Sequence, residues 1–150
     1  MSARLLFLDF DGVLRRSASP LYRLDRDLVA NLEAALRAAP DVQVVITSSW
    51  REAFSLAEMR KHFAADIQVR IVGVTPSSHS RDGFYRHREV LAYLQGHGGA
   101  GDWLAVDDDR QHYPLEAPVL LVDPAVGLDA ATAADLARRL AQGADLGRAR

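Results

Sequence analysis

Short apolar runs alternate along this chain with segments of helical periodicity, and most of the apolar runs end in polar residues. Such a run, bounded by polar residues, is typical of a strand buried on both faces of a parallel sheet. The predicted strands span residues 5–8, 42–46, 67–74, 103–106 and 119–122. The predicted helices span residues 28–36, 54–63, 84–94 and 128–140. This alternation predicts an α/β fold, a three-layer Rossmann-like parallel sheet with helices on both faces.

The composition fits one globular domain. The chain has 150 residues, of which 49% are hydrophobic, and we expect one domain over residues 1–150 with residues 143–150 as a frayed tail. A net charge of -2 excludes an overall cationic field for nucleic acid or membranes, but not a local patch. The absence of cysteine excludes disulfides, thiolate metal sites and a cysteine nucleophile. The first apolar segment is too short for a signal peptide or membrane span, so we expect a cytoplasmic protein without a membrane partner.

Polar residues gather where three of the predicted strands end. The first strand is followed by Asp9 and Asp11, the second by Thr47 and Ser48, and the fourth by an acidic run at 107–109. Ligands of open α/β sheets bind outside the carboxyl ends of the strands. An isolated Asp-x-Asp or acidic run could equally be a solvated turn, but together these clusters predict one shared crevice.

Crowded carboxylates predict both a cation and a reaction. They repel one another unless a cation neutralises them, and an all-oxygen site favours Mg²⁺. With a phosphate bound beside the cation, one carboxylate can attack phosphorus, and a second can protonate the leaving oxygen and then activate water. Gly12 would let the chain turn sharply after Asp11.

Three segments resemble signatures of the haloacid-dehalogenase (HAD) superfamily of phosphohydrolases. The segment 9–14 (DFDGVL) is similar to its first signature, 44–48 (VVITS) to its second and 106–108 (VDD) to its fourth. The resemblance implies a magnesium-dependent phosphatase with an aspartyl-phosphate intermediate. Asp9 would be the nucleophile, and Asp11 the acid/base residue whose backbone carbonyl also binds the metal.

The resemblance assigns further roles to the other two clusters. Thr47 or Ser48 would hydrogen-bond a phosphoryl oxygen, with Gly12 also in the substrate-binding set. Asp108 is favoured as a direct metal ligand beside Asp9 and Asp11, with Asp107 supporting it, although the order of the acidic pair could be reversed. Asp109 is expected to be solvated.

The third signature departs from the family pattern. The family places a lysine at the start of the helix after the third strand, but the one lysine of this chain, Lys61, lies in the preceding helix. Arg86 matches the expected spacing and Arg88 is the near alternative. Arginine stays charged and can hold two oxygens at once.

The chain has no room for the cap domain that many members of the superfamily carry. The two usual insertion points, 15–24 and 75–86, hold only about ten and about twelve residues. In this superfamily open sites tend to serve macromolecules, and the segment 47–51 (TSSWR) with 107–109 (DDD) resembles the capless branch of RNA-repair proteins. The chain is also similar to the polynucleotide 3′-phosphatases. The predicted partner is therefore a phosphorylated substrate, for which the resemblance offers a nucleic-acid end carrying a 3′-phosphate as one candidate.

A local basic rim beside the site is a further expectation. It would consist of Arg15, Arg16, Arg51 and Arg110, with Trp50 as a stacking face. The alternative is that Trp50 is a core residue and that the arginines pair with nearby acids.

Three other functions fit the same residues. They are a phosphate-binding or regulatory module without turnover, a small-molecule phosphatase, and a phosphoacceptor domain like the bacterial response regulators. An Asp-x-Asp on the first strand argues against the last, because those receivers place the phosphoacceptor on a later strand.

Overall fold

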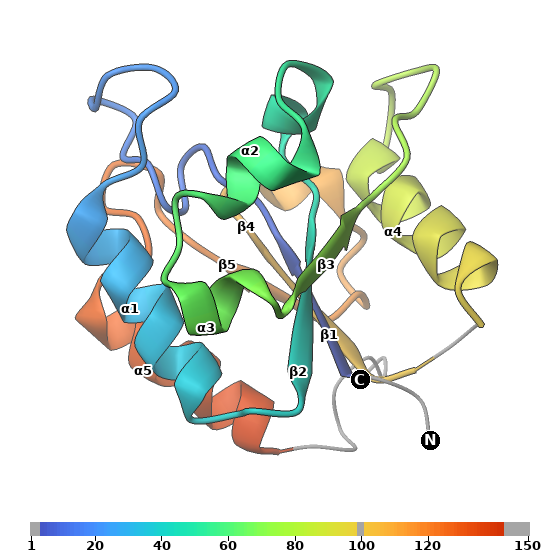
Figure 1. Cartoon of the computed structure of the whole chain (residues 1–150). Helices are drawn as coiled ribbons and strands as arrows, with labels where there is room; N and C mark the ends of the chain where they lie inside the picture. The colour runs from blue at the N-terminus through green and yellow to red at the C-terminus, as the bar shows by residue number, and fades with distance from the viewer. Residues whose placement is uncertain (1–3, 99–100, 143–150) are drawn as a thin grey trace.

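The computed structural model describes residues 4–98 and 101–142 and confirms the predicted α/β fold. Five strands, all paired in parallel, form one sheet in the order β3-β2-β1-β4-β5 (Figure 1). The strands are β1 (Arg4–Leu8), β2 (Val42–Ile46), β3 (Ile71–Val74), β4 (Trp103–Asp107) and β5 (Val119–Leu121). The strand order reverses beside β1, so a crevice opens there at the carboxyl ends of β1 and β4.

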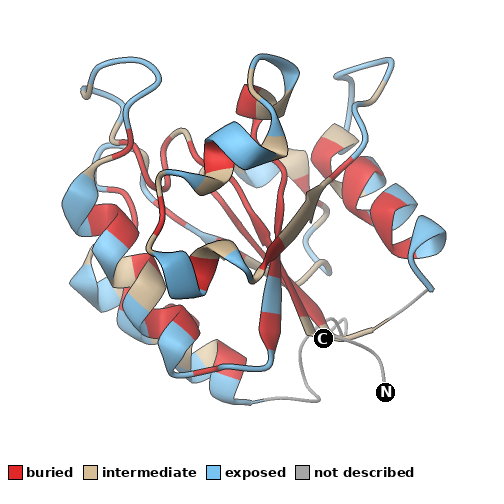
Figure 2. Ribbon diagram, viewed as in Figure 1, coloured by how far each residue is buried: buried red, intermediate tan, exposed pale blue. Residues whose placement is uncertain are grey.

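Helices cover the two faces of the sheet unequally. The larger hydrophobic core lies beneath α1 (Arg26–Arg37), α2 (Leu56–Arg60), α3 (Ala65–Gln68) and α5 (Ala130–Ala141). The opposite face is covered by α4 (Tyr85–Gly96), which packs on a smaller core around Phe7. Figure 2 shows both sets of helices turning buried residues toward the sheet. The smaller core contains four aromatic residues, and Phe7 lies edge-on to Tyr93 and Trp103.

Local sequence signals set the ends of several helices. Ser55 and Glu58 form a capping box at the start of α2, and Asp129 accepts a hydrogen bond from the Thr132 backbone N–H at the start of α5. Within α5, Nε of Arg139 lies 3.5 Å from the carboxylate of Asp135 one turn earlier. Two short 3₁₀ helices, η1 (Ser49–Glu52) and η2 (Arg110–His112), follow β2 and β4.

Two predicted elements differ from the structure. The strand predicted for 67–74 is shorter, because 65–68 form α3, which buries Ile67 in the larger core and leaves Val69 exposed. The helix predicted for 54–63 is wrong at both ends, because Ser55 caps a helix that ends at Arg60. The frayed tail predicted for 143–150 lies outside the described residues.

No cap domain is present in the described part of the chain. The segments that follow β1 and β3 form loops at the carboxyl edge of the sheet (Figure 1). Within 4–98 and 101–142, no helix has the length and apolarity that crossing a membrane requires.

Candidate active site

A row of buried polar residues crosses four neighbouring strands at the carboxyl edge of the sheet. Leu8 is paired with Ile46 and Val106, and Ile46 with Val74. The next residue on each strand is polar, which gives the row Thr75, Thr47, Asp9 and Asp107, all buried. Since side chains alternate along a strand, all four point away from the larger core, toward the face that α4 covers.

Three carboxylates come together at one end of this row. Asp9, Asp107 and Asp108 each offer an oxygen, and these oxygens lie within 4.8 Å of one another. Burial, together with the charges of Asp107 and Asp108, raises the pKa of Asp9 well above its ordinary value, although Arg86 opposes this. Burial and the charge of Asp107 raise the pKa of Asp108 to about 6. An oxygen-only site with this excess of negative charge fits a hard divalent cation such as Mg²⁺.

Gly12 allows Asp108 to approach the first signature. Its φ of 80° is one that glycine adopts readily, and a Cβ at this position would lie 2.6 Å from Cγ of Asp108. The Gly12 backbone N–H donates to the Arg15 carbonyl oxygen at 2.7 Å. The contribution of Gly12 is therefore space for the Asp108 carboxylate, since its N–H already has a partner within the chain.

Arg86, at the start of α4, faces Asp9. It is 4% exposed, and its Nη1 donates to Oε1 of Glu89 at 3.0 Å. The charge of Asp9 favours the protonated guanidinium, and the pKa of Arg86 is raised although burial opposes this. Arg88, the other candidate for the missing lysine, is exposed and donates to the Ser80 carbonyl oxygen at 3.0 Å.

Glu89 bridges two buried arginines. Its Oε2 lies 2.9 Å from Nη2 of Arg51 and accepts from the Ser78 backbone N–H at 2.7 Å. Arg51 also donates to the carbonyl oxygens of Thr47, Ser48 and Thr75. Arg51 was predicted to bind substrate, but in this structure its donors are already used within the chain.

Several buried polar atoms around Asp9 have no hydrogen-bond partner among the described residues. They are Oγ1 of Thr47, Oγ1 of Thr75, Nε of Arg86, Oδ2 of Asp107 and the hydroxyl of Tyr113. A buried polar group without a partner costs about 1–3 kcal/mol. Their concentration in one place therefore points to a ligand that would supply the missing bonds, with Asp107 Oδ2 fitting a cation and the donors fitting an anion.

The hydroxyl residues of the second signature separate into two roles. Thr47 lies in the polar row beside Asp9, with its Oγ1 buried and unpaired among the described residues. Ser48 lies on the opposite face, where its side chain accepts from the Trp50 backbone N–H at 3.2 Å and caps η1. Of the two alternatives, Thr47 is the one that faces Asp9.

Asp11 lies outside the carboxylate cluster. Its Oδ1 accepts from Nε of Arg15 at 2.7 Å and from Nε1 of Trp50 at 3.1 Å. Its side chain is 40% exposed, and Oδ2 makes no hydrogen bond within the described residues. The Asp11 carboxyl is thus held by one oxygen and can offer the other to a substrate.

Two groups near Asp107 were not found by sequence reasoning. His112 Nδ1 lies 2.9 Å from Oδ1 of Asp107, and the Tyr85 hydroxyl lies 3.2 Å from His112 Nε2. Burial raises the pKa of Tyr113 well above its ordinary value, and the charges of Asp107 and Asp9 add to this effect. The one available signal was that a histidine and a tyrosine follow the acidic run closely.

The basic rim expected beside the site is not formed as predicted. Arg15 is buried against Asp11, and Arg16 pairs with Asp27. Trp50 is 2% exposed and cannot be a stacking face. Of the predicted arginines, only Arg110 remains exposed without an acidic partner in the described residues. Asp109, expected to be solvated, caps η2 through the Gln111 backbone N–H.

A capless parallel sheet with an Asp-x-Asp after its central strand and an acidic pair after the adjacent strand defines a HAD-type hydrolase domain. The model of a family described as the HAD domain in Swiss Army Knife RNA repair proteins matches residues 5–133, and the chain belongs to this family. Neither the curated proteins nor the solved structures compared with the chain gave a match.

Proposed function

We propose that this protein is a Mg²⁺-dependent phosphatase that forms an aspartyl-phosphate on Asp9. The observation that carries the proposal is the group of unpaired buried polar atoms around that carboxylate. Donors on Thr47 and Arg86 suit phosphoryl oxygens, while unpaired Oδ2 of Asp107 suits a cation. A structural ion-pair network would leave neither set without partners.

Asp9, Asp107 and Asp108 are the proposed metal ligands, with the Asp11 backbone carbonyl as the fourth group implied by the family. When bound, Mg²⁺ would neutralise the crowded carboxylates and the phosphate charge. Unpaired Oδ2 of Asp107 favours it as a direct ligand alongside Asp108. His112 and the Asp109 backbone N–H, which both contact Oδ1 of Asp107, would fix its orientation.

In the first step, Asp9 attacks phosphorus, and the bond from phosphorus to the leaving oxygen breaks. Asp11 donates its proton to that oxygen through Oδ2. In the second step Asp11 takes a proton from a water molecule, whose oxygen attacks phosphorus and releases Asp9 and phosphate. Arg86 and Thr47 hold the phosphoryl oxygens throughout, and Glu89 keeps the Arg86 guanidinium in place.

For the substrate, we propose a nucleic-acid end that carries a 3′-phosphate. The family description names RNA repair proteins, and the loops at 15–24 and 75–86 leave the site open. A small-molecule phosphatase and a phosphate-binding module without turnover are the competing functions.

The test measures phosphate release from a 3′-phosphorylated oligonucleotide and from an aryl phosphate, with Mg²⁺ and with a chelator. Asp9→Asn removes the nucleophile with little change of shape, so we expect loss of at least about 10³-fold in kcat. Asp102→Asn is the matched control, because Asp102 stands just before β4, at the end of the sheet away from the carboxylate cluster. Near-normal turnover by Asp9→Asn would exclude the mechanism. Phosphate binding without release would identify the binding module, and faster release from the aryl phosphate would favour the small-molecule enzyme.

A further inference from the structure

The position of Asp11 indicates where the substrate's leaving group must lie. This step rests on the proposed function, in which Asp11 protonates the leaving oxygen. The leaving group must therefore lie against the surface beside Asp11. Arg15 and Trp50, which hold the carboxyl, are both buried and offer little surface of their own.

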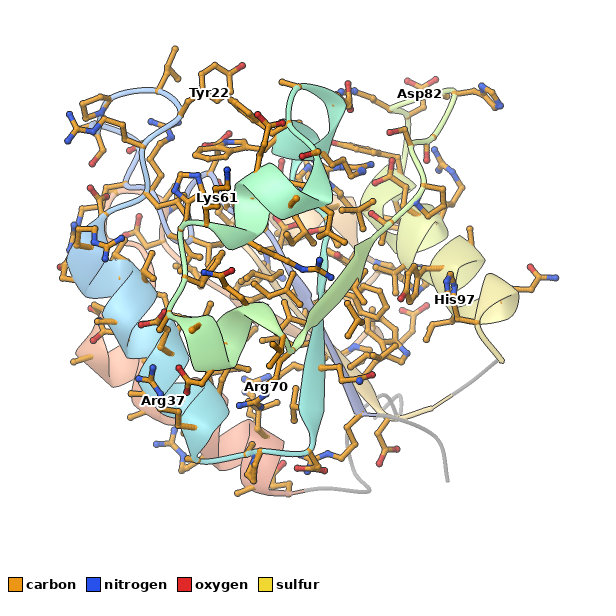
Figure 3. The ribbon with its side chains drawn as sticks, in the orientation of Figure 1. Tyr22, Arg37, Lys61, Arg70, Asp82 and His97 are labelled. Atoms are coloured by element: carbon orange, nitrogen blue, oxygen red, sulfur yellow. The ribbon has the colours of Figure 1, made fainter. Side chains whose placement is uncertain are left out.

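Tyr22 provides the exposed surface next to this pair. Its ring lies edge-on to Trp50 at a centroid distance of 5.5 Å and to Phe54 at 5.4 Å. The residue is nevertheless 56% exposed. In Figure 3 it lies on the loop that follows β1, at the end of the molecule where the loops after β2 and β3 also project. An aromatic ring is thus connected to Asp11 through a single residue, Trp50.

The backbone at Tyr22 is held in an unusual conformation. Its φ of 59° makes it the one non-glycine residue with positive φ among the described residues. A bulky side chain in this region is a true outlier, and such outliers concentrate at functional sites. The loop keeps this conformation although the residue is more than half exposed.

Cations without a carboxylate partner among the described residues stand next to these aromatic residues in the chain, since Arg23 follows Tyr22 and Lys61 precedes His62. Arg23, Arg26 and Lys61 are exposed, and none has a carboxylate within 4.0 Å in the described residues. Arg26 Nη1 donates to the His62 carbonyl oxygen at 3.5 Å, and the His62 ring lies 5.6 Å from that of Trp50. Aromatic rings beside cations are the usual combination for single-stranded nucleic acid, because bases stack while the cations meet phosphates.

We propose that Tyr22 stacks on the base of the terminal nucleotide whose 3′-phosphate is held at Asp9. The stacking face predicted at Trp50 is then supplied by Tyr22, and Trp50 connects it to Asp11. The ring gives the site a preference for a leaving group that carries a base. Arg23, Arg26 and Lys61 meet the phosphodiester groups of the preceding nucleotides.

The test compares two 3′-phosphorylated oligonucleotides that differ only in whether the terminal nucleotide carries a base. Tyr22→Gly removes the ring and suits the positive φ, so the loop keeps its conformation. Tyr22→Phe keeps the ring. Val69→Ala is the control, because Val69 is exposed at the opposite end of the sheet, just before β3. Melting temperatures confirm that each variant is folded.

Wild type should prefer the base-bearing end by at least about fivefold in kcat/KM, the size expected for one stacked base. Tyr22→Gly should lose this preference through a higher KM, while Tyr22→Phe and Val69→Ala should keep it. An unchanged preference in Tyr22→Gly, or a loss that lies in kcat, would overturn the stacking role while the proposed function stands. Absence of release by wild type from either oligonucleotide and from the aryl phosphate would overturn both.

Discussion

A single residue, Gly12, determines how closely the first and fourth signatures approach each other. In Gly12→Ala the new Cβ would overlap the Asp108 carboxylate, and φ of 80° would be strained. The carboxylate must then move away from Asp9. We expect Mg²⁺ affinity, measured by calorimetry, to fall about 10–100-fold. Gly96→Ala is the control, because a Cβ there meets nothing within 4 Å, and equal affinities in both variants would contradict this role of Gly12.

Glu89 is the carboxylate that balances the charges of both buried arginines, Arg51 and Arg86. Glu89→Gln keeps the shape but removes the charge that compensates Arg86 and Arg51. Breaking a buried ion pair in this way costs about 3–5 kcal/mol, so we expect a clear fall in the free energy of unfolding, measured with urea. The control is Glu52→Gln, which removes an exposed partner of Arg81 and should cost less than about 1 kcal/mol. Similar losses of unfolding free energy in the two variants would show that Glu89 stabilises the fold no more than an exposed acid does.

Sequence analysis found the site residues that stand at the carboxyl ends of strands. Asp9, Thr47 and Asp107 could be placed together because parallel strands end at the same edge. Glu89 could not, since its partners depend on the rotation of α4 about its axis, which no local pattern fixes. The burial of Trp50 could be given only as one of two alternatives, because it depends on how the loop around Tyr22 folds over η1.

At the scale of elements, Arg70 forms hydrogen bonds to α1 and β2 that the sequence alone does not predict. It lies between α3 and β3, where its guanidinium donates to the carbonyl oxygens of Leu36, Ala39 and Val42 (Figure 3). These bonds join the end of α1 to the start of β2. Arg70→Met removes them, and we expect a cost of at least about 1.5 kcal/mol, or a fall in Tm of about 3–6 °C.

Arg37 offers the matched comparison for Arg70. Its guanidinium forms two bonds to Asp66 on the surface, so Arg37→Met should cost less than about 1 kcal/mol. If both variants melted at the same temperature, the carbonyl contacts of Arg70 would contribute no more than a surface pair.

The error at the start of the third strand has a clear physical cause. The segment from Ile67 to Val74 has enough apolar residues for a strand despite Gln68 and Arg70, but periodicity cannot distinguish a short buried helix from a strand. Helix α3 buries Ile67 in the larger core, and Arg70 then turns the chain into β3. Tertiary packing, rather than local preference, decides where β3 begins.

At the scale of the whole molecule, the carboxylate cluster makes stability depend on pH and metal. The pKa of Asp108 is about 6 in the folded protein against an ordinary value of 3.8. Between these pH values the unfolded chain loses the proton while the folded chain keeps it, so stability falls as pH rises. Above about pH 6 the Asp108 carboxyl is ionised in the folded chain as well. The loss of stability caused by its raised pKa then no longer changes with pH. Asp9, whose pKa is also raised, acts in the same direction.

Asp108→Asn keeps the shape and removes this penalty. In chelator at pH 7.5 we expect the variant to melt about 2–4 °C above wild type, a modest gain because solvent screens the partly exposed carboxylate. The gain should shrink as pH falls toward 4, where wild type also carries the proton. Mg²⁺ should reverse the order, since a ligand that binds only the folded state stabilises wild type. Asp102→Asn, which changes a partly exposed acid just before β4 at the other end of the sheet, should follow wild type in each condition. A variant that melted below wild type in chelator at pH 7.5 would show that the crowded carboxylates do not oppose folding, and that the charge of Asp108 is balanced without a cation.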